Sequence, residues 1–382
     1  MRACNHGDMS EWIAIGFGAL DVRGGQFAEH GDLLVASISA GDPVFLTGDG
    51  ARLWQALVDG PVDDASLTAA DRAIIAEMAE AGFASSDVQH PHRIRAVQAP
   101  WLTSAFHELV YSVVQSVAQE NSIPLVFIKG PALHAQGLRD REHSGDVDCW
   151  VAPGDDLRLA AALAPWGWDA VISPFSGTGV PHSLTLSTDG WRCAIDVHTY
   201  FPGMTVAPPR AFALLQERSE PRIYAGTSAH VPAKADNAVI AALHEARPQH
   251  QAVTSAQIER AKDPLRRAGH EVIDAVETYG AGFALALALR GAFPEVTRSE
   301  SLSPAPADWH WRSIASGPRR HLAALRLVAW RDRPRVIFRL LWPDNRSAQA
   351  LAGDTTIAAP RRAALRLRRA GRALVDLVRP AP

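Results

Sequence analysis

The chain has 382 residues, more than one typical domain contains, so its length alone suggests two or three domains. Hydrophobic residues make up 47% and charged residues 21%, which is typical of a folded globular protein rather than a disordered one. The net charge of −3 excludes a uniformly basic, histone-like protein. The three cysteines form no C-x-x-C pair, which excludes a zinc ribbon and a disulfide scaffold.

The start of the chain does not have the pattern of a signal peptide. The first twelve residues carry acidic groups where a signal peptide needs a basic flank and an apolar core. The best apolar run, residues 281–289, ends at Arg290 and is too short to cross a membrane. We therefore expect a cytoplasmic protein without a membrane span.

Basic residues are unevenly distributed along the chain. Residues 311–382 hold 16 arginines and four aspartates, and only three lysines occur anywhere, at positions 129, 234 and 262. Each lysine is informative, because a compact ammonium does work that a planar guanidinium does not. The Arg-rich end, with a helix expected from Pro360, could contact nucleic acid or an anionic membrane. It lacks interleaved lysines and aromatic residues, so we interpret it as solvated helix and expect no nucleic-acid partner.

The first segment is expected to be a small winged-helix unit. Apolar runs predict strands at 33–39 and 44–46 and a helix at 51–58. Residues 66–68 are typical of a helix cap, and a second helix is expected through Glu80. Two strands followed by helices at this size indicate a winged helix. Residues 85–100 are polar and rich in His and Pro, which predicts a linker.

The most informative stretch begins with a buried-type strand at 125–128. Lys129-Gly130-Pro131 follows it, then a helix at 132–138 and a polar loop flanked by Arg139 and Arg141. A second strand is expected at 146–151. Because alternate residues of a strand share a face, its apolar positions should face the core. Asp146 and Asp148 should then project together from the opposite face.

Paired carboxylates at this spacing point to a cation. They repel each other unless a cation lies between them, and Mg²⁺ prefers such oxygen ligands. Another strand at 192–198 places Asp196 and His198 on one face, so a third carboxylate could complete a two-metal site or accept a proton. The simpler alternative is a solvated strand end, with Asp196 paired to an arginine and His198 merely hydrogen-bonded.

The remaining elements complete an α+β fold. A strand is expected at 182–188, and helices at 105–119, 233–246, 258–267 and 272–289. The sequence thus predicts a small mixed β-sheet core with flanking helices, preceded by the winged-helix-like domain and followed by a helical, Arg-rich region. The expected domains are 1–95, 96–205 and 206–382.

The order of these motifs resembles the nucleotidyltransferase superfamily, which includes DNA polymerase β. The similarity is greatest to a poorly characterised branch that opens with L-K-G-x-A-L, here IKGPAL at 128–133. It extends from Trp101 to the Arg-rich end, where LLWPDNRSAQAL resembles the trailing segment of that branch. Two features depart from the classical pattern. Gly130-Pro131 replaces Gly-Ser, and 15 residues separate Gly130 from Asp146.

The resemblance implies a role for each matching residue. Asp146, Asp148 and Asp196 correspond to the catalytic, metal-binding carboxylates, with two Mg²⁺ ions and an NTP as substrate. Nucleotide-binding positions would be Lys129, Gly130, Arg139, Arg141 and His198, with the glycine allowing close approach of its backbone to phosphate and the cations offering charge to the phosphates.

The N-terminal segment resembles the PqqD-like domains that bind leader peptides. The match consists of an apolar strand pair, LTGDGARLWQALVDG at 46–60 and a helix closing with EMAEAGFA at 77–84. A generic winged helix with a packed Trp54 fits the same pattern. Together the two resemblances imply Mg-dependent transfer of an NMP to an unknown acceptor, with a ribosomally synthesised peptide or other natural product as candidate. The alternatives are a non-catalytic peptide- or nucleotide-binding adaptor and a kinase-like phosphotransferase.

Overall fold

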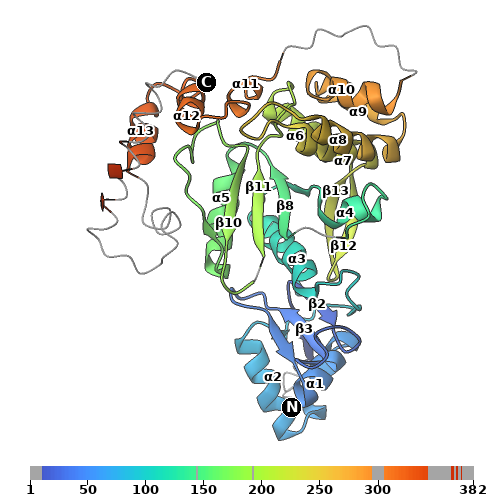
Figure 1. The fold of residues 1–382 in the computed structure, drawn as a ribbon. Coiled ribbons are helices and arrows are strands. Elements are labelled where there is room, and N and C mark those ends of the chain that lie inside the picture. The colour runs from blue at the N-terminus through green and yellow to red at the C-terminus, as the bar shows by residue number, and fades with distance from the viewer. Residues whose placement is uncertain are drawn as a thin grey trace, which may run out of the picture.

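The computed structural model describes residues 11–142, 145–191, 193–294 and 305–342, together with positions 363–364, 367–368 and 371. Within them the chain is an α+β protein, as the sequence predicts (Figure 1). Most of the trailing match to the nucleotidyltransferase branch, and the start of the helix expected from Pro360, lie outside the described residues.

Two small antiparallel sheets and two helices form the N-terminal unit. One sheet has the order β5-β1-β6 and the other β2-β3-β4. The elements are β1 (Glu11–Ala14), β2 (Gly18–Asp21), β3 (Leu33–Ala36), β4 (Val44–Leu46), α1 (Gly48–Asp59), β5 (Val62–Asp63), the 3-10 helix η1 (Asp64–Ser66), α2 (Ala69–Glu80) and β6 (Ala84–Ser85). Trp54 is fully buried in the core of this unit, and Thr68 caps α2 with a capping box to Asp71. The four predicted elements are confirmed, but the short strands β1, β2, β5 and β6 were not predicted.

The central sheet has five strands in the order β7-β8-β11-β10-β9. Their bounds are β7 (Leu125–Phe127), β8 (Asp146–Val151), β9 (Asp169–Ala170), β10 (Ser183–Ser187) and β11 (Ala194–His198). Strands β8 and β11 run parallel, and the other pairs are antiparallel. The helices α3 (Ala105–Glu120) and α5 (Asp155–Leu163) pack with the residues Val147, Cys149 and Val151, which confirms the predicted core face of β8. The short 3-10 helix η2 (Ala164–Trp166) follows α5.

A second core contains Trp150 of β8 and Val126 of β7 and is otherwise built mainly from helices. After the short helix α4 (Gly130–Ala135), they are α6 (Pro208–Glu217), α7 (Lys234–Ala246), α8 (Ser255–Ala268), α9 (Val272–Thr278) and α10 (Gly282–Ala292), with the hairpin β12 (Ser219–Tyr224) and β13 (Thr227–Pro232) beside them. The single helix predicted at 272–289 is wrong. Gly280 has a φ of +63°, a left-handed conformation that ends α9, and α10 begins two residues later.

Helices α11 (Trp309–Arg312), α12 (Gly317–Leu325) and α13 (Arg333–Leu341) follow, and α12 and α13 stand to one side of the sheet (Figure 1). A small satellite core joins α12 and α13 to the loop at 175–180. Within the described part of the chain, every helix is too short or too polar to cross a membrane.

The segment expected to be a linker, residues 85–100, lies against the N-terminal sheets. Arg93 forms an isolated bridge with Ile15, and Gln98 forms one with Leu20. Phe17, Leu20 and Leu34 of the N-terminal unit belong to the same buried cluster as the central sheet. The Ser112 hydroxyl of α3 contacts both the carbonyl of Phe17 and the hydroxyl of Thr227. The N-terminal unit and the central sheet thus share a continuous core.

Candidate functional site

Lys129 follows β7 with an unusual backbone conformation. Its φ of 57° and ψ of −126° lie in a region that residues other than glycine rarely adopt. Its backbone N–H donates to Asn237 Oδ1 of α7 at 3.0 Å. Gly130 also has a positive φ, and a Cβ there would overlap the hydroxyl of Tyr111. Surrounding contacts on both sides therefore hold the Lys129-Gly130 turn in place.

The Lys129 ammonium contacts a buried carboxylate. Its Nζ lies 2.5 Å from Asp148 Oδ1, and the two side chains are 11% and 3% exposed. Antiparallel pairing of β7 with β8 brings the end of one strand beside the middle of the other. The resemblance implied a phosphate-binding role for Lys129, and this direct contact with Asp148 was not predicted.

Asp148, Asp196 and His198 form a compact cluster on β8 and β11. Asp148 and Asp196 are paired across the two parallel strands. His198 Nε2 lies 3.0 Å from Asp148 Oδ1, and the Thr185 hydroxyl of β10 donates to Asp196 Oδ1 at 2.6 Å. One potential ligand atom from each of the three residues lies within 4.8 Å of the others. The sequence prediction that Asp196 and His198 share a face of their strand is confirmed.

The donor set of this cluster fits a divalent cation. Two carboxylates supply the oxygen ligands that Mg²⁺ prefers, and the imidazole nitrogen also suits Mn²⁺ or Zn²⁺. His198 Nδ1 is buried and has no hydrogen-bond partner among the described residues. Asp148, Asp196 and His198 could therefore hold the metal. In this set the third ligand is His198, whereas the sequence pattern suggested Asp146.

Burial shifts the pKa values of Asp196 and His198 in opposite directions. Burial is the main cause that raises the pKa of Asp196, and the nearby Asp148 carboxylate adds to it. Burial lowers the pKa of His198 well below its ordinary value, and the charges of Lys129 and Arg247 lower it further. A neutral imidazole is the form that can act as a metal ligand.

Asp146 lies two residues before Asp148 on the same strand and pairs with Ala194. It is not among the described side chains that gather within 4.8 Å of one another. It is still close enough to Asp196 to contribute to the raised pKa of that carboxyl. The structure thus brings Asp148 and Asp196 together, and the third predicted carboxylate, Asp146, lies two residues further along β8.

The two predicted arginines occupy different environments. Arg139 donates from Nη2 to the carbonyl of Gly130 at 2.8 Å and from Nε to the carbonyl of Arg141 at 2.8 Å. Burial lowers the pKa of Arg139, while the nearby Tyr111, Asp148 and Asp146 act in the opposite direction. Arg141 is exposed on the loop before β8. Arg139 thus braces the glycine turn, and Arg141 remains at the surface.

Two further arginines near the cluster were not predicted. Arg247 Nη1 lies 2.9 Å from Nε2 of His182, and Arg312 Nη2 lies 3.4 Å from Nδ1 of the same ring. The ring centroids of His182 and His198 are 5.4 Å apart, so His182 lies beside the cluster. Burial lowers the pKa of Arg247, and the charge of Arg312 adds to this. Both arginines come from distant helical segments, and no local pattern links them to β11.

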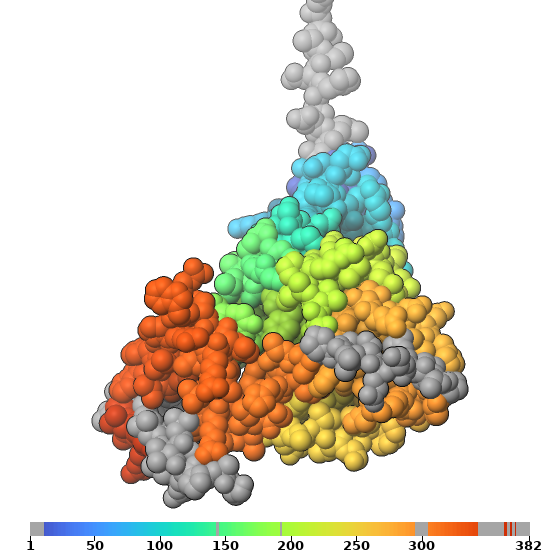
Figure 2. All heavy atoms as spheres, turned by 90° about the horizontal axis from the view of Figure 1, so that it is seen from above, coloured from blue at the N-terminus to red at the C-terminus, as the bar shows by residue number. Residues whose placement is uncertain are grey.

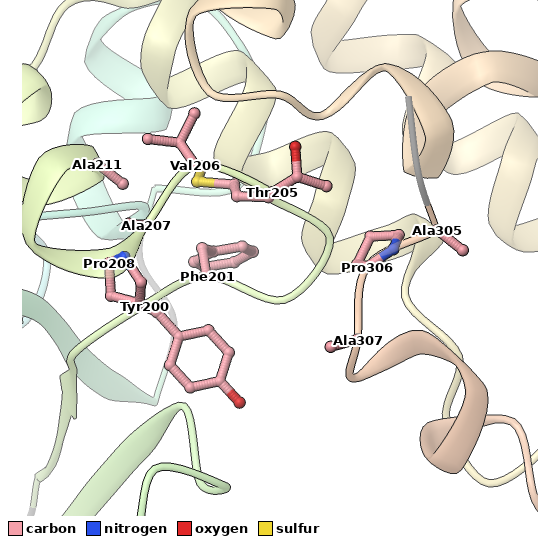
Figure 3. A pocket seen from close by; sticks show the side chains of 11 residues that line it. Tyr200, Phe201, Thr205, Val206, Ala207, Pro208, Ala211, Ala305, Pro306 and Ala307 are labelled. Atoms are coloured by element: carbon pink, nitrogen blue, oxygen red, sulfur yellow. The ribbon is translucent and has the colours of Figure 1, made fainter. Parts of the chain in front are cut away.

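A cavity of about 310 Å³ lies beyond the end of β11, between residues 200–211 and 305–307 (Figure 3). Its lining is largely apolar and carries no charged side chain. The hydroxyl of Tyr200 donates to the carbonyl of Val180, and that of Thr205 to the carbonyl of Gly280. Phe201 lines the cavity and stacks on the imidazole of His198, with ring centroids 5.6 Å apart. One aromatic ring thus connects the cavity with the cluster.

No protein-family model matches the chain, and no curated protein matches it. Among solved structures, the chain is similar to the solution structure of the antibiotic-resistance factor ANT(2'')-Ia, with 14% sequence identity and a TM-score of 0.31. The similar region covers 49% of this chain and 94% of that one. A similarity of this size defines neither a family nor an activity.

Proposed function

We propose that this chain is a nucleotidyltransferase that moves an NMP from an NTP to an acceptor hydroxyl, with pyrophosphate as the leaving group. The observation that carries the proposal is the pairing of Asp148 with Asp196 on parallel strands, beside a lysine and a glycine that follow the neighbouring strand. Carboxylates in register on neighbouring strands repel each other, which favours a metal ion between them, and a metal ion beside a basic glycine turn suits a phosphorylated substrate. The order of these residues in the sequence supports the same reading.

Each residue would have a distinct task. Asp148, Asp196 and His198 would hold Mg²⁺ or Mn²⁺, with Asp146 as a nearby additional carboxylate. When bound, the metal would stabilise the negative charge that develops on the transferred phosphoryl group. Lys129 would leave Asp148 for a phosphate oxygen of the NTP, and Gly130 would let the backbone approach the phosphates. Asp196, oriented by Thr185, would accept the proton of the acceptor hydroxyl.

The test is transfer of label from α-³²P NTPs to an extract of the native host in the presence of Mg²⁺. We expect incorporation with the wild type and loss of about 100-fold or more in the variants Asp148→Asn and Asp196→Asn. Asp189→Asn, at an exposed turn, is the matched control and should retain activity. Label incorporated from γ-³²P NTP but not from α-³²P NTP would replace this proposal with a kinase-like transfer.

A peptide is the acceptor that the N-terminal unit favours. Strand β4 is the outer strand of the sheet β2-β3-β4, and Val44 on it is exposed. An outer strand can accept an extended peptide as a further strand. Once a labelled acceptor is known, hydrogen exchange at residues 44–46 should slow in its presence. Peptide binding there without nucleotidyl transfer would favour the adaptor function instead.

A further inference from the structure

The helices α12 and α13 form what we call the C-terminal hairpin, residues 317–342. Its inner side is fixed to the body of the protein. Ala324, Val328 and Val336 pack with Phe175 and Val180 in the satellite core. Arg335 donates to the carbonyl of Gly177 at 3.3 Å, and Arg339 to that of Ser176 at 2.8 Å. These contacts determine which side of the hairpin faces outward.

The outward side is rich in large apolar side chains. Trp330, in the turn between the helices, is 81% exposed, and Phe338 of α13 is 64% exposed. At 3.6 residues per turn, Ile337, Phe338 and Leu341 share one face of α13, whereas the inward Val336 lies on another. The exposed apolar residues of the hairpin include Leu322, Leu327, Trp330, Ile337, Phe338 and Leu341. Such a patch indicates an interaction surface.

The same surface is strongly basic. The hairpin itself contains seven arginines and one aspartate, and Arg326, Arg331 and Arg333 are exposed. Arg333 donates to the backbone carbonyls of Val328 and Arg326, which are neutral, so these hydrogen bonds do not cancel its charge. The following residues, 343–382, contain eight arginines and three aspartates, so this part of the chain would add positive charge if it covered the patch. Charge complementarity therefore favours an anionic partner from outside the chain.

We propose that the C-terminal hairpin binds the surface of an anionic lipid membrane. Exposed tryptophan, phenylalanine and leucine beside arginines are typical of helices that lie in a membrane interface, where the apolar side chains enter the acyl boundary and the cations meet lipid phosphates. Aliphatic side chains contribute little to nucleic-acid binding, which relies on stacking and phosphate contacts. The hairpin also protrudes from the body, which suits a broad surface rather than a groove (Figure 2). The inference does not depend on the proposed transferase activity.

The test is flotation of the full chain with lipid vesicles. Binding to vesicles of phosphatidylcholine and phosphatidylglycerol should exceed binding to pure phosphatidylcholine by about tenfold or more and should fall as salt rises. The variant Trp330→Ser/Phe338→Ser should lose about tenfold of this binding. The control Val171→Ser/Ile172→Ser, which removes two exposed apolar side chains elsewhere, should bind like the wild type. Thermal unfolding checks that both variants remain folded.

Three results would overturn the proposal. One is the absence of flotation with anionic vesicles, or equal flotation with both lipid compositions. Another is binding to single-stranded DNA that survives the Trp330→Ser/Phe338→Ser substitutions while vesicles are not bound, which would assign the basic surface to nucleic acid. A third is a dimer in solution that these substitutions convert to a monomer without a change in flotation, which would make a second copy of the chain the occupant of the patch.

Discussion

Lys129 Nζ lies 2.5 Å from Asp148 Oδ1, and both side chains are largely buried. Removing one partner of such a pair leaves an uncompensated charge in the interior. We therefore expect Lys129→Met to lower the free energy of unfolding by about 3–5 kcal/mol, measured by urea denaturation. Adding Asp148→Asn to this variant should recover part of the loss. Lys234→Met, at an exposed lysine, serves as the control, and an equal loss there would contradict the prediction.

The backbone at Lys129 can be tested separately from its charge. Its φ of 57° with ψ of −126° suits glycine better than any residue with a Cβ. Lys129→Gly and Lys129→Ala both remove the ammonium, and they differ in the strain at this turn. The glycine variant should be more stable than the alanine variant by about 1–3 kcal/mol. Equal stabilities would show that the turn is relaxed in the alanine variant.

Gly130 allows close approach of the chain to Tyr111, so a methyl group there should be costly. Gly130→Ala would overlap the Tyr111 hydroxyl and force a left-handed alanine. We expect it to cost at least about 2 kcal/mol of unfolding free energy. Adding Tyr111→Phe should restore part of this loss, because the hydroxyl has no hydrogen-bond partner among the described residues. Gly60→Ala, where a Cβ meets no neighbour, should change stability by less than about 0.5 kcal/mol.

Glu108 should make stability depend on pH. It accepts hydrogen bonds from the backbone N–H groups of Trp101, Leu102 and Ala225, but its burial raises the pKa of the carboxyl. The folded state therefore binds a proton more readily than the unfolded state. The contribution of Glu108 to stability should fall as pH rises from about 4 through the raised pKa.

The measurement is the urea midpoint as a function of pH for the wild type and Glu108→Gln. The stability of the wild type relative to Glu108→Gln should fall as pH rises, because only the wild type bears the penalty for ionising a buried carboxyl. Glu80→Gln, at an exposed position, should follow the wild type throughout. A difference that is constant with pH would mean that the Glu108 carboxyl titrates alike in both states.

His198 should affect Mn²⁺ more than Mg²⁺. Imidazole nitrogen is a better ligand for Mn²⁺ than for Mg²⁺, which prefers oxygen. His198→Ala should weaken Mn²⁺ binding about tenfold or more by isothermal titration, with a smaller effect on Mg²⁺. His134→Ala, at an exposed histidine, should leave both affinities unchanged. Unchanged affinities for both ions would place His198 outside the ligand set.

Period-two alternation was sufficient to predict the strands that hold the site. It gave β8 its bounds and put Asp148 on the face opposite Val147 and Cys149, because a strand has only two faces. The close approach of Lys129 to Asp148 could not be derived in this way. It depends on which strand pairs with β8 and on the conformation of one turn, and both are fixed by distant residues such as Asn237.

The helical region shows where local patterns are insufficient. The apolar run through residues 272–289 continues across Gly280, so periodicity alone does not reveal the break between α9 and α10. Arg247 and Arg312 reach His182 only through the packing of helices far apart in the sequence. The strands β1 and β2 have four residues each, too few for alternation to distinguish them from loop.

The Ser112 hydroxyl contacts both Phe17 of the N-terminal unit and Thr227 of the β12–β13 hairpin, and the segment at 93–98 is bridged to Ile15 and to Leu20 of β2. The N-terminal unit is therefore packed against the rest of the protein and is not joined to it by a flexible linker. A ligand held on the outer strand β4 would lie at a constant distance from Asp148. In the proposed transfer to a bound peptide, the position of the modified group would then be set by its spacing from the anchored end.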